Sequence, residues 1–142
     1  MKIQEIMTTS VSVIRPTDTI FDAAKKMRDL NVGILPVCFG RRMDGTITDR
    51  DITLRAVAEG RDPSNTLVMD VMSPDVIYCY QDDNVEHVEQ MMMDYQIRRL
   101  PVVARKTKEL VGIISIGDLA TKTGKVQEVG RTLREISEPA HA

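Results

Sequence analysis

The chain has 142 residues, of which 42% are hydrophobic and 28% charged. This length provides for one compact domain or for two half-size units that share a core, and the composition excludes a disordered segment. The net charge of -2 gives no global attraction to nucleic acid, and no stretch approaches the roughly 20 apolar residues of a membrane span. We therefore expect a cytoplasmic globular protein with no membrane partner, for which nucleic acid is an unfavoured ligand.

The sequence contains an internal repeat. A shift of 65 residues places IQEIM (3–7) on VMDVM (68–72), and a shift of 67 then places Asp51 on Asp118. Repeats of this kind indicate one structural unit used twice. We predict a first motif over residues 1–62, a second over 66–124, and a C-terminal helix with a loose tail over 125–142.

Each repeat is predicted to fold as strand, helix, strand, strand, helix, which makes the fold class α+β. In the first repeat the predicted elements are a strand at Val11–Ile14, a helix with the apolar stripe Ile20, Ala23, Met27 and Leu30, strands at Ile34–Cys38 and up to Ile47, and a helix from about Asp49 to Glu59.

The second repeat follows the same order. Its predicted elements are a strand at Val76–Tyr80, a helix with the stripe Val85, Val88, Met92 and Tyr95, strands at Leu100–Val103 and up to Ile114, and a helix at Ile116–Lys122. Beyond it, the spacing of Val126, Val129, Leu133 and Ile136 predicts the extra amphipathic helix.

The segments GTITDRD (45–51) and GIISIGD (112–118) carry the chemistry most typical of a ligand site. Each places a hydroxyl residue where a strand gives way to a helix, and unpaired N–H groups at a helix start favour an anion such as phosphate. The aspartate three positions later can accept hydrogen bonds from paired hydroxyls such as those of ribose. The alternative is structural, because a hydroxyl followed by an acid also forms a capping box that starts a helix.

These segments, the paired LPV strands and the duplication together resemble a CBS-domain pair, or Bateman module, over Ile3 to about Gly124. The similarity is to stand-alone bacterial two-CBS proteins, including those like the mycobacterial hypoxic response protein. It implies two pseudo-symmetric β-α-β-β-α repeats packed through their sheets, with clefts that bind adenosine-containing ligands: AMP, ADP, ATP or S-adenosylmethionine.

The resemblance also implies a role for individual residues. Asp51 and Asp118 would contact ribose hydroxyls, and Thr48 and Ser115 would contact phosphate. The residues expected to flank adenine are Val11 and Val76, with the backbone near Pro36 and Pro101.

Two differences between the repeats predict unequal sites. Ser115 replaces the commoner threonine, and Gly117 stands where the first repeat has Arg50, which we include in the first site; both changes predict a weaker second site. In the opposite sense, only the second repeat has Arg98 and Arg99 before its central strand. These guanidinium groups either bind phosphate or are solvated charges at a strand edge.

The leading hypothesis is a non-catalytic regulatory module, because no serine, cysteine or histidine arrangement suggests a nucleophile with its base. It would need no cofactor, would bind an adenine nucleotide with or without Mg²⁺, and would act on an unidentified effector protein. We also expect a homodimer, since a chain of this size cannot bury the apolar faces of all its helices internally.

Two alternatives stay open. The first is a structural or interaction module without nucleotide binding, responsive to redox state or to metal through Cys38 or Cys79, although two cysteines make neither a disulfide framework nor a metal cluster and buried free thiols are expected. The second is nucleic-acid binding through the basic hairpin loops, disfavoured by the scarcity of aromatic residues.

Overall fold

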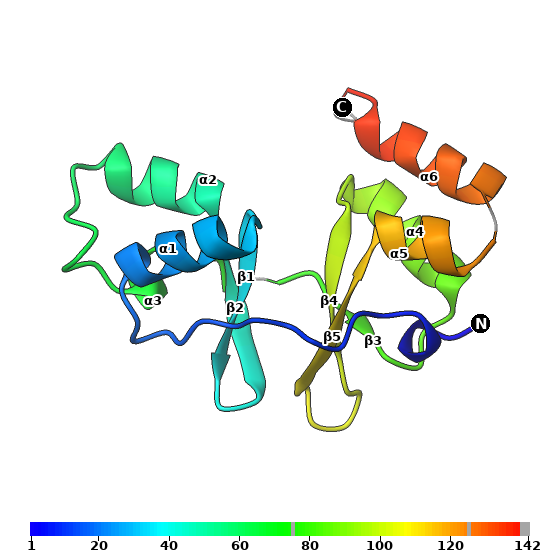
Figure 1. Cartoon of the computed structure of the whole chain (residues 1–142), viewed down its shortest axis with the longest axis horizontal. Helices are drawn as coiled ribbons and strands as arrows, with labels where there is room; N and C mark the ends of the chain where they lie inside the picture. The colour runs from blue at the N-terminus through cyan, green and yellow to red at the C-terminus, as the bar shows by residue number, and fades with distance from the viewer. Residues whose placement is uncertain (75, 125, 140–142) are drawn as a thin grey trace. The chain divides into compact units, whose positions relative to one another are not determined.

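Two compact units make up the computed structural model, which describes residues 1–74, 76–124 and 126–139 (Figure 1). Ser12–Val76 form one unit, which we call the Asp51 unit. Residues 1–11 and the described residues from Ile77 onward form the other, the Asp118 unit. The end of the predicted tail, residues 140–142, lies outside the described residues.

The Asp51 unit is built around an antiparallel hairpin. Its elements are α1 (Ile20–Leu30), β1 (Ile34–Phe39), β2 (Arg42–Thr48), α2 (Asp49–Ile52), the π-helical turn η2 (Thr53–Val57) and α3 (Val68–Val71). The core consists of buried side chains from α1, η2, α3 and both strands, among them Ile20, Leu35, Ile47, Ala56 and Val68, and Ile52 of α2 packs against it partly buried.

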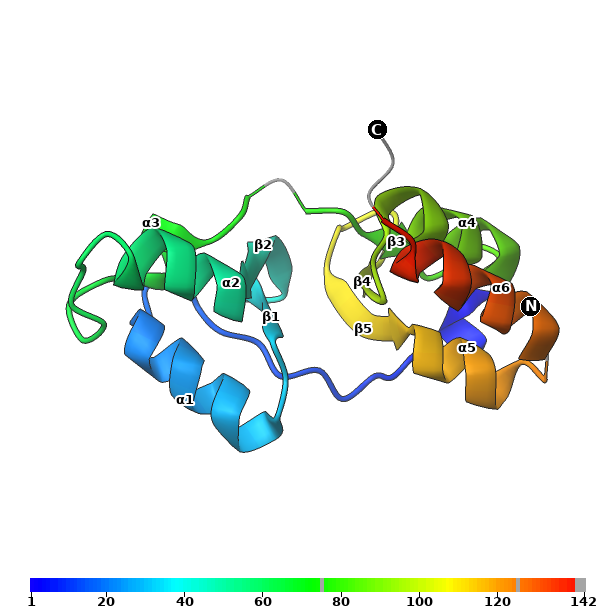
Figure 2. The same cartoon turned by 90° about the horizontal axis from the view of Figure 1, so that it is seen from above.

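The Asp118 unit repeats this plan and adds to it (Figure 2). Its elements are η1 (Ile3–Glu5), β3 (Cys79–Tyr80), α4 (Val85–Tyr95), β4 (Arg99–Val103), β5 (Leu110–Ser115), α5 (Ile116–Lys122) and α6 (Val126–Ser137). The sheet order is β3-β4-β5, with β3 parallel to β4 and β5 antiparallel to it. α6 packs against α4 and α5.

The helices begin and end for local reasons. The hydroxyl of Thr19 accepts a hydrogen bond from the N–H of Asp22 at 3.1 Å, which starts α1 with the expected capping box. Asn31 and Gln96 end α1 and α4 in the left-handed conformation, at φ 54° and 53°. The second helix of the first repeat is helical from Asp49 to Val57, slightly shorter than predicted.

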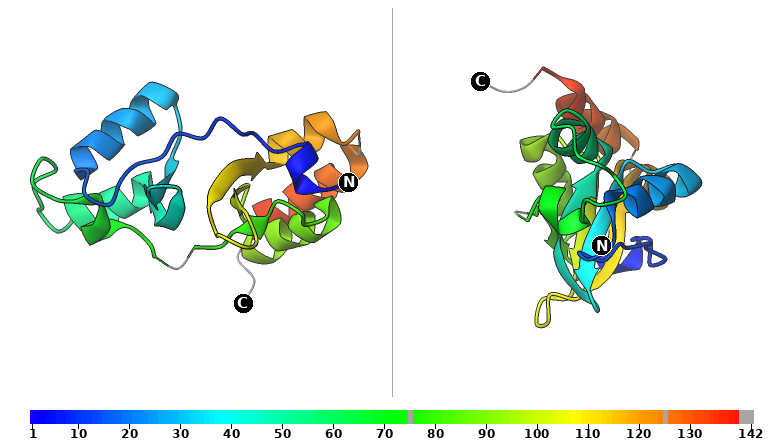
Figure 3. Two further views of the ribbon diagram at one scale, coloured as in Figure 1. Left: turned by 90° about the horizontal axis from the view of Figure 1, so that it is seen from below. Right: turned by 90° about the vertical axis from the view of Figure 1, so that its left-hand side faces the viewer.

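The units do not coincide with the sequence repeats, because the first segment of each repeat completes the fold of the other. Thr8 pairs with Ile113 in one unit, and Ser73 pairs with Thr46 in the other. Figure 3 shows η1, in dark blue, beside the orange α5. This exchange places IQEIM and VMDVM each in the core of the other repeat. The N–H of Ile3, for example, donates to the carbonyl of Asp83, more than 60 positions along the chain.

Some local predictions were wrong. The strand expected at Val11–Ile14 is a single parallel bridge from Ile14 to Val37, and the one expected at Val76–Tyr80 is reduced to β3, because only these residues lie opposite a strand. The last members of two stripes, Leu30 and Tyr95, are exposed at the ends of their helices. In α6 the buried positions include Thr132 in place of the expected Leu133.

Candidate ligand-binding sites

Asp51 is held at the start of α2 by a reciprocal pair of hydrogen bonds. Its N–H donates to the hydroxyl of Thr48 at 3.0 Å, and its carboxylate accepts the N–H of Thr48 at 3.0 Å. The capping box that the sequence allowed as a structural alternative is therefore formed. It uses one lone pair of the hydroxyl and one oxygen of the carboxylate, so the Thr48 O–H and the other carboxylate oxygen stay available to a ligand.

A second hydroxyl lies against this carboxylate. The Oγ of Ser73 is 3.4 and 3.5 Å from the two carboxylate oxygens of Asp51, longer than a strong O–H to carboxylate bond. Ser73 is placed there by its backbone, whose N–H donates to the carbonyl of Thr46 at 2.8 Å. Gly45 permits this approach, since a Cβ at that position would lie 2.5 Å from the Ser73 carbonyl oxygen.

The Asp118 unit has the same arrangement, with Ser115 in place of Thr48 and Thr8 in place of Ser73. Ser115 and Asp118 exchange two hydrogen bonds of 3.0 Å at the start of α5. The hydroxyl of Thr8 lies 3.4 and 3.5 Å from the Asp118 carboxylate oxygens, and its backbone pairs with Ile113. A Cβ on Gly112 would meet the Thr8 carbonyl oxygen at 2.8 Å.

The charge around the two aspartates differs. The ammonium of Lys122 lies 3.2 Å from a carboxylate oxygen of Asp118. The residue that aligns with Lys122 is Arg55, which donates instead to two backbone carbonyls, those of Val71 and Met72. Asp118 is thus partly neutralised by a neighbouring cation, whereas the carboxylate of Asp51 contacts a backbone N–H and a hydroxyl.

The residues expected to flank adenine divide between the units. Val76 belongs with Pro36 in the Asp51 unit, and Val11 belongs with Pro101 in the Asp118 unit. Both valines are half-buried, and both prolines are buried in the central strands. Each valine lies three residues after the hydroxyl that contacts its aspartate, on the same exchanged segment.

The predicted arginines are exposed, and two of them, Arg98 and Arg99, lie beside the start of α5. Arg99 lies directly across the hairpin from Ser115, and the carbonyl of Arg98 accepts the N–H of Ile116 at 2.9 Å. Both therefore flank the start of α5. Arg50 is exposed on α2.

Ser73, Thr8, Arg55 and Lys122 were missed by reasoning from the motif alone. The signal was available in the repeat, because a shift of 65 pairs Thr8 with Ser73 and a shift of 67 pairs Arg55 with Lys122. Neither pair is identical in type, which makes such correspondences easy to overlook.

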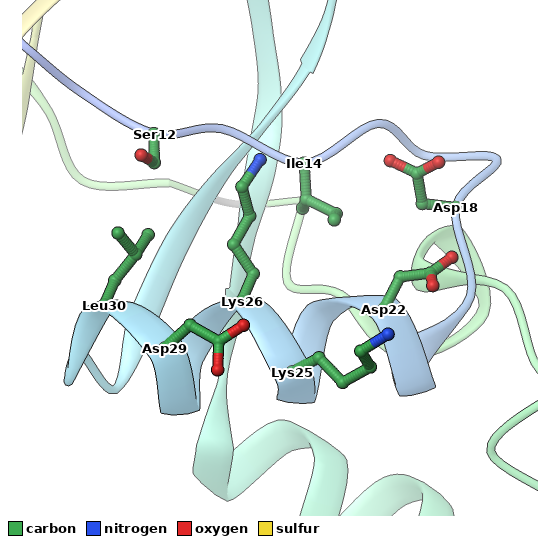
Figure 4. Close-up of a pocket in the computed structure, with 8 residues that line it drawn as sticks. All are labelled: Ser12, Ile14, Asp18, Asp22, Lys25, Lys26, Asp29 and Leu30. Carbon is green, nitrogen blue, oxygen red and sulfur yellow. The ribbon is translucent and has the colours of Figure 1, made fainter.

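A cavity of about 490 Å³ lies elsewhere in the Asp51 unit, between α1 and the segment that precedes it (Figure 4). It is lined by Ser12, Ile14, Asp18, Asp22, Lys25, Lys26, Asp29 and Leu30. The ammonium of Lys26 donates to the carbonyl of Val13 at 2.6 Å. The lining includes neither Thr48 nor Asp51.

Both cysteines are buried free thiols, as expected. Burial, with a smaller contribution from Asp44, raises the pKa of Cys38 to about 11. Burial, with Asp83, raises the pKa of Cys79 to about 12. Because the thiolate is the reactive form, both thiols are poor nucleophiles near neutral pH.

The described residues contain no group of three or more histidine, cysteine, aspartate or glutamate side chains arranged to hold a metal ion. No helix among them has the length and apolarity needed to cross a bilayer.

Two half-size α+β units, each with a capped aspartate and an adjoining hydroxyl at the end of a hairpin, define a tandem regulatory domain of the CBS type. The CBS domain family matches residues 3–57 and 68–123, so the chain belongs to this family. It is 40% identical over 135 residues to the CBS domain-containing protein YhcV of Bacillus subtilis, covering 95% of this chain and 94% of that protein.

Two other CBS proteins show the same fold. Hypoxic response protein 1 of Mycobacterium tuberculosis is 30% identical over 118 residues, covering 82% of this chain and 81% of that protein. A crystal structure of Hypoxic Response Protein I with two coordinated zinc ions superimposes with a TM-score of 0.77 at 29% identity, over 86% of this chain and 98% of that one. A hexameric CBS-CP12 protein from bloom-forming cyanobacteria gives a TM-score of 0.69 at 32% identity, over 89% and 73% of the two chains.

Proposed function

We propose that the protein is a non-catalytic regulatory module that binds an adenosine-containing ligand through Asp51 and Asp118. The observation that carries this proposal is the repeated aspartate, anchored by its capping box through one carboxylate oxygen and contacted by a hydroxyl only at 3.4 Å, with Lys122 as a further partner of Asp118 at 3.2 Å. A carboxylate in this state is ready to accept stronger hydrogen bonds from a ligand. Membership of the CBS family supports regulation as the role of the chain.

The chemistry of the site suits a nucleotide. The two ribose hydroxyls would donate to the carboxylate of Asp51 or Asp118, and the hydroxyl of Ser73 or Thr8 would turn from the carboxylate to a ribose oxygen. The spare O–H of Thr48 or Ser115 would donate to a phosphate oxygen at the start of the helix, where the helix dipole favours an anion. Mg²⁺ would accompany the polyphosphate of ADP or ATP as part of the ligand.

Arg98 and Arg99 would add phosphate contacts in the Asp118 unit, because they flank Ser115 in the hairpin register. Adenine would lie against the exchanged segment at Val76 or Val11. Arg50 would contribute on α2 of the Asp51 unit.

Regulation would follow from the exchanged segments. Ser73 and Thr8 lie where the first segment of one repeat contacts the hairpin of the other. A ligand that bonds to both the aspartate and the adjoining hydroxyl changes how these segments are held, and it thereby shifts the balance between two packings. An effector protein, or a second copy of this chain, would sense the difference. The hexameric CBS-CP12 protein supports self-association in this family, and we propose a homodimer here.

A thermal-shift series tests ligand binding. AMP, ADP, ATP and S-adenosylmethionine are each added with and without Mg²⁺, and a ligand at about 100 times its dissociation constant should add about 2.7 kcal/mol to the free energy of unfolding. Asp51→Ala and Asp118→Ala should each lose part of this stabilisation, and the double variant should lose it all.

Asp22→Ala is the matched control, because Asp22 closes the same kind of capping box on α1 in the Asp51 unit. It should lower the starting stability by a similar amount and leave the ligand response intact. If no adenosine-containing ligand stabilises the protein at millimolar concentration, the structural alternative replaces this proposal, with Ser73 and Thr8 as permanent partners of the aspartates.

A further inference from the structure

A cationic side chain on the second helix of each unit reaches the segment that carries the adjoining hydroxyl. The guanidinium of Arg55 donates to the carbonyls of Val71 at 3.2 Å and Met72 at 3.1 Å, immediately before Ser73. The ammonium of Lys122 donates to the carbonyl of Ile6 at 3.1 Å, two residues before Thr8. Ile6 aligns with Val71 in the repeat, so the same contact has formed twice with two different cations.

These carbonyls need a partner for a physical reason. Val71 ends α3 and Ile6 caps η1, and the last carbonyls of a helix have no partner within it and carry partial negative charge. Helices of four and three residues are not stable by themselves. A cation that binds their last carbonyls therefore fixes the direction in which the chain leaves each short helix.

That direction decides where the hydroxyl lies. Ser73 follows the two carbonyls bound by Arg55 and pairs with Thr46 through backbone hydrogen bonds of 2.8 and 3.0 Å. In η2, which carries Arg55, the N–H of Ala58 donates to the carbonyl of Thr53 at 2.9 Å, the wide turn of a π-helix. Such turns redirect side chains within a helix and are frequent at functional sites.

We propose that Arg55 and Lys122 are positioning residues for ligand binding, which act by holding the segments of Ser73 and Thr8 against the aspartates. This inference rests on the proposed function. The two residues act differently, because Lys122 also pairs with Asp118 at 3.2 Å and so adjusts the charge of the site as well as its geometry. Arg55 acts on geometry alone, through the backbone of Val71 and Met72.

Binding of AMP to the Asp51 unit tests this role by calorimetry, with Asp118→Ala present throughout so that one site is measured. Arg55→Met should weaken AMP binding about tenfold, which corresponds to about 1.4 kcal/mol. Arg55→Lys should recover most of the loss, because an ammonium can still donate to the carbonyls. Arg28→Met is the control, since Arg28 is exposed in the same unit and pairs with its neighbour Asp29.

A double-mutant cycle shows whether Arg55 acts through Ser73. In a Ser73→Ala background, Arg55→Met should change AMP affinity by less than about twofold, because the hydroxyl that it positions is gone. If the two losses simply add, Arg55 does not act through Ser73 and the proposal is wrong.

Amide hydrogen exchange gives a readout that needs no ligand. Arg55→Met should speed exchange of the Ser73 and Thr46 amides about tenfold, as expected for local opening, and leave the amide of Ile47 unchanged. If AMP does not bind, whichever of ADP, ATP and S-adenosylmethionine stabilises the protein replaces it in these titrations. If none of the four ligands binds the wild-type protein, the proposed function fails and exchange alone decides the positioning role. If AMP binds and Arg55→Met changes neither affinity nor exchange, the positioning role fails and the proposed function stands.

Discussion

At the scale of single residues, helix capping and the proposed ligand binding would use different atoms of the same side chains. The cap occupies one lone pair of Thr48 and one carboxylate oxygen of Asp51. The remaining O–H and the second oxygen are then held in fixed positions, where the proposed ligand would meet them, because the cap restricts both rotamers. A residue that already stabilises a helix is in this way preorganised to bind, at little further cost in side-chain entropy.

The glycines of the two motifs are required by close backbone contact. Gly45→Ala would place a Cβ 2.5 Å from the carbonyl oxygen of Ser73. The bridge between Thr46 and Ser73 must then shift, and we expect a loss of about 1–3 kcal/mol in the free energy of unfolding, as for an overpacked core. Chemical denaturation measures this loss.

Gly130→Ala is the matched control, since a Cβ there meets nothing within 4 Å and the residue lies inside α6. Alanine should stabilise that helix by up to about 1 kcal/mol. Equal effects of the two substitutions would contradict the steric argument for Gly45.

The buried thiols should make stability depend on alkaline pH. The pKa of Cys38 is raised in the folded state to about 11 from about 9, so the unfolded chain ionises first as the pH rises. The contribution of the buried thiol is therefore complete below about pH 9 and falls as the pH approaches 11. Cys38→Val, which copies Val103 of the other repeat, should flatten the decrease in unfolding free energy between pH 9 and 11.

Thiol labelling checks the same interpretation independently. At neutral pH, native protein should react with a thiol reagent only as fast as it opens, and Cys79, with its pKa of about 12, should behave like Cys38. Rapid labelling of either thiol in the folded protein would show that it is accessible and would restore the redox-responsive alternative.

At the scale of secondary-structure elements, the sequence predicts those helices and strands that a local pattern of residues determines. The stripe of α1 up to Met27, the capping boxes and the two hairpins follow from periodicity and cap residues, and these predictions are confirmed. The segments at residues 3–7 and 68–72 are too short for periodicity to show, so η1 and α3 were missed. Their exchange between repeats depends on which core they pack into, and nothing in the local pattern of IQEIM or VMDVM distinguishes the two cores.

The residues of the candidate sites also divide into those that a local motif predicts and those that only the fold brings together. Asp51, Thr48 and their counterparts were predictable because they share a motif with fixed spacing. Ser73 and Arg55 contact the site from other segments, through a backbone bridge and a helix end, and only the fold brings them there. Their repeat partners Thr8 and Lys122 differ in residue type, which conceals the correspondence in the sequence.

The extra helix α6 should contribute to stability through a narrow face. Ile136 is buried at 8% exposure, whereas Leu133 on the same helix is 40% exposed. Ile136→Ala should cost about 2–4 kcal/mol by leaving a cavity against α4, and Leu133→Ala should cost less than about 1 kcal/mol. Thermal or chemical unfolding distinguishes these values, and similar losses for both would mean that α6 packs through the stripe predicted from its spacing.

At the scale of the whole molecule, the two sites should differ in the salt dependence of ligand binding as well as in affinity. Arg98, Arg99 and Lys122 place three cationic groups near Ser115 and Asp118, and the Thr48 side has Ile34 across the hairpin in place of Arg99. Binding of a polyphosphate near more cations is weakened more strongly by screening. Titration of ATP into Asp51→Ala and Asp118→Ala at rising salt should show the steeper loss for the variant that retains Asp118. Identical salt slopes would contradict this difference.

Self-association is expected because the described surface retains large apolar side chains on the helices of the Asp51 unit. Phe21 on α1 is 48% exposed, Leu54 in η2 is 47% exposed and Val57 is 61% exposed. In the Asp118 unit, α6 packs on α4 and α5, the helices that correspond to α1 and α2. Within residues 12–74, the Asp51 unit has no additional helix of this kind. Exposed apolar side chains of this size on neighbouring elements are typical of an interface, and a two-fold pairing is the commonest way for a soluble protein to cover one.

Light scattering at micromolar concentration should therefore give twice the chain mass of 16.0 kDa. Val57→Asp places a charge within the exposed apolar side chains and should reduce the mass to that of one chain, since an unpaired charge is costly to bury at an interface. Met69→Asp is the control, because Met69 is similarly exposed at 46% in the same unit but lies on α3. A wild-type mass near 16.0 kDa would rule out the homodimer, and loss of the dimer in Met69→Asp alone would move the interface from α1 and η2 to α3.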